Sequence, residues 1–120
     1  DPYLLKMRDG RPFAFASVWD RWTRAAAPIE SCAILTTAAN DLVARVHDRM
    51  PVILDRAAYD LWLDPNAPEE DLHRVLRPFP AEDMVAVPVS PRVNSAAVDD
   101  PECERPIAEP PPAPVQTTLF

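Results

Sequence analysis

The sequence predicts a small α+β domain that is rich in β-structure. Short apolar segments of β-branched and aromatic residues alternate with segments of helical periodicity, which favours a mixed architecture. The chain has 120 residues and is 48% hydrophobic, enough for one domain with a real core. It contains one Gly and 16 Pro, so Pro, Asn and Asp must make most turns. We place this domain at residues 1–98.

Four segments are expected to form strands. PFAFASVW (12–19) alternates with a period of two residues, as a strand with one buried face does. SCAILTT (31–37) and PVIL (51–54) are short apolar runs. MVAVPVS (84–90) contains Pro88, which lacks an N–H group and indicates a sheet edge or a bulge.

Three segments are expected to be helical. Residues 38–46 place apolar side chains on one helical face, with Thr37 as the N-cap. Asp55 is expected to cap a helix over residues 56–63. A further helix opens at Pro68, and its acidic first turn suits the helix dipole.

From Asp99 the composition changes to an acidic, Pro-rich stretch without periodicity. Residues 99–115 are therefore expected to be an extended, disordered linker. The chain ends in QTTLF (116–120), which has the form of a docking peptide on a tether. The alternative is a frayed terminus without a role.

The strongest candidate for proton chemistry is the cluster His47, Asp48 and Arg49, which precedes a strand on irregular backbone. Imidazole is the side chain whose ordinary pKa lies near neutrality. A second candidate is Asp20, which lies between Trp19 and Trp22. The alternatives are a surface turn with a local ion pair for His47 and a solvated strand end for Asp20.

Net charge and cysteine use narrow the function classes. The net charge of the whole chain is −7, but residues 1–50 carry seven Lys/Arg against six Asp/Glu. A local phosphate-binding face is therefore possible in residues 1–50. The alternative is that these charges are scattered over the surface and only keep the protein in solution. Cys32 and Cys103 do not read as a disulfide pair, which favours a reducing, cytoplasmic setting. We expect no metal site, no cofactor, no signal peptide and no membrane span.

Several motifs together resemble the C-terminal half to two-thirds of the SRAP domain family, the SOS response-associated peptidases or abasic-site processing proteins. They occur in family order over residues 2–98. The motifs are RPFAFASVWDRW (11–22), TTAAN (36–40), HDRMPVIL (47–54), DLWLDP (60–65) and PVSPRVNS (88–95).

The resemblance implies a barrel-like central sheet and a protein that binds single-stranded DNA. In the family, an N-terminal Cys joins the aldehyde of an abasic site, while a His and a Glu transfer protons. His47 matches that His, and Asp20 falls at the Glu position, one methylene shorter. Arg49, Arg45 and Asn40 are the expected DNA-binding residues.

The resemblance also leaves alternatives. The sequence begins at Asp1 without the N-terminal Cys, which suggests a fragment, a misplaced start or a decayed copy. The family name implies a peptidase, but no residue identifies a peptide substrate. A non-catalytic interaction module is the alternative function. Its tail is similar to the pentapeptide that docks bacterial repair proteins on the sliding clamp, through Gln116, Leu119 and Phe120, and the protein is expected to be a monomer.

Overall fold

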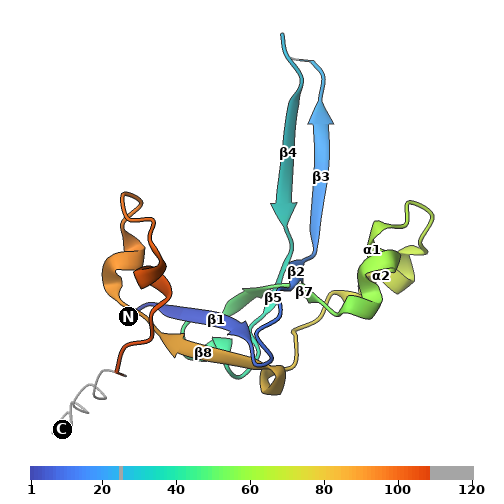
Figure 1. The fold of residues 1–120 in the computed structure, drawn as a ribbon. Coiled ribbons are helices and arrows are strands. Elements are labelled where there is room, and N and C mark those ends of the chain that lie inside the picture. The colour runs from blue at the N-terminus through green and yellow to red at the C-terminus, as the bar shows by residue number, and fades with distance from the viewer. Residues whose placement is uncertain (25, 109–120) are drawn as a thin grey trace, which may run out of the picture. The chain divides into compact units, whose positions relative to one another are not determined.

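The computed structural model describes residues 1–24 and 26–108. They belong to two compact units, one formed by residues 1–5 with the segment from 87 onward and one formed by residues 6–86. The boundary between the units falls within strands β1 (Tyr3–Met7) and β8 (Met84–Pro88), which pair with each other (Figure 1). The residues predicted to carry proton chemistry all belong to the unit of residues 6–86.

The core of this unit is built from three extended segments. Each segment is two strands separated by one residue that leaves the ladder, and the strands pair antiparallel as β2–β7, β3–β4 and β5–β6. The strands are β2 (Ala14–Phe15), β3 (Ser17–Trp22), β4 (Ile29–Ile34), β5 (Thr36–Ala38), β6 (Arg49–Pro51) and β7 (Ile53–Leu54).

The three segments meet where Ala16, Leu35 and Val52 join them. The Ala16 N–H donates to the Val52 carbonyl at 2.8 Å, the Val52 N–H to the Leu35 carbonyl at 2.9 Å, and the Leu35 N–H to the Ala16 carbonyl at 2.9 Å. This closed ring, here called the strand junction, satisfies all three donors without a continuous ladder. Ala16 and Val52 are 0% and 1% exposed, so the junction lies at the centre of the core.

The helices that pack against this core come from residues 59–75. Around Ala16, Val52 and Leu54 pack the partly buried side chains of Leu35, Tyr59, Trp62, Val75 and Leu76. Tyr59 and Trp62 belong to α1 (Tyr59–Leu63), and Val75 ends α2 (Glu69–Val75). The remaining short elements of this unit are the 3-10 helices η1 (Val43–Arg45), η2 (Arg56–Ala58) and η3 (Ala81–Asp83).

The other unit holds the end of the described chain. It contains the 3-10 helices η4 (Pro91–Asn94) and η5 (Pro101–Glu104), joined by an Arg92–Asp100 ion pair of 2.6 Å. Val89 forms an isolated bridge with Pro106. Residues 99–108 of the expected linker therefore carry these contacts, whereas residues 109–120, with the expected docking peptide, lie outside the described residues.

Turn chemistry follows the prediction from composition. Asp9, Asp55, Asp64 and Asp100 each accept a hydrogen bond from the backbone N–H two residues later. The single glycine, Gly10, has a φ of 73° in the turn after β1, a conformation that favours glycine. The predicted cap at Asp55 and the acidic first turn after Pro68 are also confirmed.

Two expectations were wrong in detail. Residues 38–46 are not an α-helix, because Thr36–Ala38 pair with β6 and only Val43–Arg45 form a 3-10 turn. The barrel-like central sheet is likewise not found in the described residues, whose strands form four two-stranded sheets. The coarser prediction, a small α+β fold, is confirmed. In the described part of the chain, no helix has the length and apolar character needed to cross a membrane.

Candidate active site around His47

His47 lies near the end of the loop, residues 39–48, that connects β5 to β6. The Ala39 N–H donates to the Asp48 carbonyl at 3.1 Å, which closes the base of the loop, and the His47 N–H donates to the Val43 carbonyl at 2.9 Å. The side-chain oxygen of Asn40 accepts the Val43 N–H at 2.9 Å. These bonds fix the backbone of residues 39–48 and therefore the direction in which the imidazole leaves it.

One nitrogen of the His47 ring is engaged and the other is left for a ligand. Nδ1 lies 3.0 Å from the Arg49 N–H, 3.1 Å from the Arg49 carbonyl and 3.1 Å from a carboxylate oxygen of Asp48. In one neutral tautomer Nδ1 accepts the Arg49 N–H and Nε2 carries the proton; in the other, Nδ1–H donates to the Arg49 carbonyl or the Asp48 carboxylate and Nε2 is an acceptor. In the charged ring both nitrogens carry a proton. The side chain is 67% exposed, so Nε2 can donate a proton to a bound molecule or accept one from it, according to the protonation state of the ring.

Arg49 is fixed by Thr36 across the β5–β6 ladder. Its Nη2 donates to the Thr36 carbonyl at 2.8 Å and to the Thr36 hydroxyl at 2.9 Å. With Nη2 occupied, the exposed guanidinium keeps Nε–H and Nη1–H for another acceptor such as a phosphate oxygen. Thr36 was not predicted as a site residue, and the sequence signal for it is its place at the start of the TTAAN motif (36–40). Its position opposite Pro51 in the β5–β6 ladder is seen only in the structure.

The side chain of Asn40, which was predicted to bind DNA, makes its hydrogen bonds to other groups of the protein. Its Nδ2 donates to the Phe79 carbonyl at 2.7 Å and approaches the Met84 sulfur at 3.4 Å, while Oδ1 takes the Val43 N–H. Its polar atoms therefore hold the His47 loop against the segment before β8. Arg45, the last residue of η1, is an exposed residue of the same loop.

Asp20 is placed on a different arm of the strand junction. Asp20 lies in the middle of β3, where it pairs with Ser31, and is four residues after Ala16 of the junction. His47 lies on the far side of β6, five residues before Val52 of the junction. Its carboxylate accepts the Arg21 N–H at 2.7 Å. No hydrogen bond or ion pair within the described residues joins Asp20 to His47, and Figure 1 shows the β3–β4 hairpin leading away from β5.

The two cysteines lie apart from this loop. Cys32 is exposed on β4, Cys103 is half-buried in η5, and both are free thiols. The described residues contain no group of three or more His, Cys, Asp and Glu side chains arranged to hold a metal ion.

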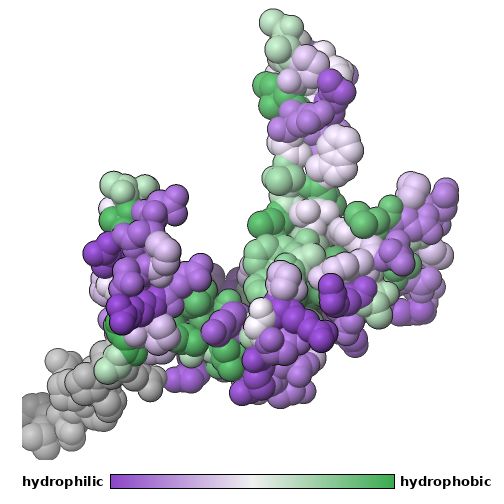
Figure 2. Space-filling view, in the orientation of Figure 1, coloured by the Kyte–Doolittle hydropathy of each residue, from purple (hydrophilic) through white to green (hydrophobic). Residues whose placement is uncertain are grey.

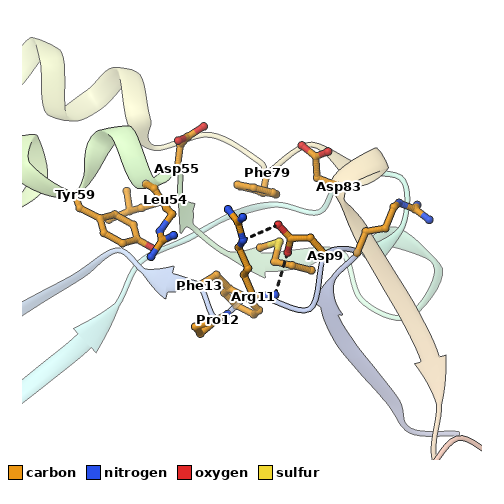
Figure 3. A pocket seen from close by; sticks show the side chains of 12 residues that line it. Asp9, Arg11, Pro12, Phe13, Leu54, Asp55, Tyr59, Phe79 and Asp83 are labelled. Carbon is orange, nitrogen blue, oxygen red and sulfur yellow. Dashed lines mark hydrogen bonds and ion pairs between the residues drawn. The ribbon is translucent and has the colours of Figure 1, made fainter.

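A cleft of about 490 Å³ lies elsewhere in the same unit (Figure 3). Its walls include the rings of Phe13, Tyr59 and Phe79, and Arg11 extends into it from an ion pair with Asp9. Three arginines and three aspartates line it, so it offers no net charge to a phosphate. The cleft is not lined by any of the five residues predicted to act in catalysis or DNA binding, which are Asp20, Asn40, Arg45, His47 and Arg49.

Residues 1–96 match the family model described as SOS response associated peptidase (SRAP), and the chain belongs to this family. The His47 loop and the strands around it therefore lie within the residues that match an SRAP domain.

The named relatives are abasic site processing proteins. The chain is 40% identical over 103 residues to YoqW of Bacillus subtilis (strain 168), covering 84% of this chain and 46% of YoqW. It is 36% identical over 104 residues to HMCES of Gallus gallus, covering 83% of this chain and 30% of HMCES.

A solved structure of a protein from Bacteroides thetaiotaomicron has the same fold. It superposes with a TM-score of 0.81 at 27% identity, covering 89% of this chain and 48% of that one. A protein from Bordetella bronchiseptica superposes with a TM-score of 0.62 at 38% identity, covering 71% and 43%. The chain thus spans less than half the length of these relatives.

Proposed function

We propose that this chain takes part in processing abasic sites in single-stranded DNA, with His47 as the group that moves protons at the damaged sugar. The observation that carries the proposal is the His47 ring itself, whose Nδ1 is held by Arg49 and Asp48 while two-thirds of the side chain stays exposed. The names of the relatives support the substrate class.

The chemistry of an abasic site requires such a group. Its sugar opens to an aldehyde, and addition of an amine or thiol to that carbonyl needs a proton at the developing hydroxyl and removal of another from the nucleophile. Nε2 of His47 can supply and accept these protons. Arg49, two residues later in the chain, offers a cationic donor to a flanking phosphate.

The covalent step is assigned to no residue of this chain. The resemblance to the family implies that an N-terminal Cys forms the crosslink, and neither Cys32 nor Cys103 is N-terminal. We also leave Asp20 out of the mechanism, because its carboxylate is on the hairpin arm and accepts the Arg21 N–H. The proton-transfer role therefore rests on His47 alone.

The test uses the product of the complete open reading frame and a single-stranded oligonucleotide with one abasic site. His47→Ala is expected to slow processing of this DNA by about 100-fold, the lower range for loss of a general acid–base group. His73→Ala is the matched control, because His73 is 68% exposed and also lies beside one carboxylate, Glu69. Equal rates for the two variants would remove His47 from the reaction.

A second proposed function concerns the tail and rests on its sequence alone. We propose that Gln116, Leu119 and Phe120 dock the protein on a DNA sliding clamp, with the two apolar side chains in a pocket and Gln116 at its rim. A pull-down with purified clamp would compare the wild-type chain with the Leu119→Ala/Phe120→Ala variant. Equal retention of both would end this proposal.

A further inference from the structure

Thr36 and Arg49 lie diagonally across the β5–β6 ladder, on its exposed face. The register pairs Ala38 with Arg49 and Thr36 with Pro51, so these side chains share one face. Met50, on the other face, is 2% exposed. Diagonal neighbours in an antiparallel pair are within reach of a long side chain. Because the residue directly opposite Arg49 is only an alanine, the guanidinium can pass over it and reach Thr36.

Arg49 is held by neutral oxygens, which leave its positive charge uncompensated. Its Nη2 donates to the carbonyl and to the hydroxyl of Thr36. Within the described residues, its guanidinium makes no ion pair with a carboxylate. Other arginines of the chain do, and they are Arg11, Arg21, Arg74, Arg92 and Arg105. A neutral anchor fixes the position of a cation without cancelling the charge that an anion recognises.

A cation held in this way matters because the chain as a whole is acidic. The net charge is −7, and on the face shown in Figure 2 hydrophilic side chains are spread over both units and not gathered into one patch. Binding of a DNA phosphate then depends on a few well-placed cations rather than on a broad basic surface. A side chain that is already held in place loses less rotamer freedom when the phosphate binds.

Arg49 also connects this anchor to the His47 ring. The Arg49 backbone N–H lies 3.0 Å from Nδ1 of His47, while the Arg49 side chain bonds to Thr36. The imidazole and the guanidinium are thereby fixed relative to each other. A phosphate bound to Nε–H and Nη1–H of Arg49 therefore sets where the neighbouring sugar lies relative to Nε2 of His47.

We propose that Thr36 is a positioning residue. Its hydroxyl holds the Arg49 guanidinium so that Nε–H and Nη1–H face the phosphate beside the abasic sugar, and Thr36 itself does not contact the DNA. This role rests on the proposed function of the His47 site. Because Thr36 acts only through Arg49, removing its hydroxyl has no effect on DNA binding once the guanidinium is absent.

The test measures the affinity of the product of the complete open reading frame for a single-stranded oligonucleotide with one tetrahydrofuran residue. This abasic analogue has no aldehyde and does not react. Thr36→Val keeps the shape of the side chain, and it is expected to weaken binding about fivefold, as the loss of one hydrogen bond does. In the Arg49→Ala background the same substitution is expected to change the affinity by less than about 1.5-fold.

Two further variants serve as controls. Thr36→Ser keeps the hydroxyl and is expected to bind within about twofold of wild type. Thr37→Val is the matched control, because Thr37 is on the same strand but the opposite face, and its hydroxyl makes no hydrogen bond within the described residues. If Thr36→Val does not fold, Thr36→Ala takes its place in both backgrounds.

Equal weakening by Thr36→Val in both backgrounds would show that Thr36 acts without Arg49, and it would overturn the proposal. The absence of weakening in the wild-type background would also overturn it. A salt titration separates this failure from failure of the proposed function. Arg49→Ala is expected to reduce the slope of log affinity against log salt by about 0.7, the value for one phosphate contact on a single strand.

The two failures give different results in this titration. If the wild-type protein does not bind the oligonucleotide, the proposed function fails, and the role of Thr36 fails with it. If Arg49→Ala reduces the slope while Thr36→Val binds like wild type, the phosphate contact stands and only the positioning role of Thr36 is wrong.

Discussion

Replacing Asn40 by Ala is expected to destabilise the fold and to leave DNA recognition by the folded molecules intact. The side chain bridges the His47 loop and the segment before β8 through the Val43 N–H at 2.9 Å and the Phe79 carbonyl at 2.7 Å. Alanine removes both bonds at once. Val43 is 3% exposed and Phe79 is half-buried, so water replaces the lost partner of each backbone group only in part.

The expected cost is about 2 kcal/mol. Loss of an Asn that accepts a backbone N–H at the start of a helical turn costs about 1 kcal/mol, and the net value of a neutral hydrogen bond to a carbonyl is about 1 kcal/mol. In a domain of this size that corresponds to a fall of roughly 10 °C in the unfolding midpoint.

Urea unfolding followed by circular dichroism measures this cost, with Asn66→Ala as the control. Asn66 is exposed, and within the described residues its side chain makes no hydrogen bond. A wild-type stability for Asn40→Ala, combined with a loss of affinity for abasic DNA, would refute the structural role. It would instead support the DNA-binding role predicted from the sequence.

Two further substitutions test the remaining assignments. Asp20→Asn is expected to leave the rate of processing of abasic DNA within about twofold of wild type, because the amide oxygen can still accept the Arg21 N–H. A rate loss above tenfold in the same assay would show that Asp20 takes part in the reaction. Val52→Ala is expected to cost about 2 kcal/mol in urea unfolding, since Val52 is 1% exposed at the strand junction and the deletion leaves a cavity. A cost below about 0.5 kcal/mol would mean that the junction repacks freely.

The sequence predicted the approximate positions of the strands but not how they pair. PFAFASVW was predicted as one continuous strand, and the structure breaks it at Ala16, where the chain changes partner from β7 to β4. An alanine in an apolar run gives no local sign of such a change, because the closed ring of bonds with Leu35 and Val52 is a tertiary feature. The alternation of apolar and polar side chains indicates which face of a strand is buried, but not which other strand it pairs with.

The same limit explains why the helix predicted over residues 38–46 is not found. Leu42, Val43 and Val46 have helical spacing, yet the β5–β6 ladder fixes Thr36–Ala38 as a strand, and only a single turn remains for η1. Helical propensity over nine residues is weak compared with tertiary pairing. By contrast, the cap at Asp55 and the acidic first turn after Pro68 depend on neighbouring residues only, and they were predictable.

For the candidate site, motif content predicted the residue types but not their uses. The interpretation of His47 as an exposed group at the entrance to a strand agrees with its 67% exposure, whereas Asn40 was expected to face DNA and instead bonds to Phe79. The difference arises because an amide can serve a ligand or the backbone equally well. Only the partner that lies 39 residues later in the chain decides between them.

The geometry of the His47 site does not depend on contacts with the β3–β4 hairpin. The hydrogen bonds that orient His47, Arg49 and Asn40 all end on residues between Thr36 and Met84, and none involves β3 or β4. The geometry of the imidazole is therefore a property of these residues alone.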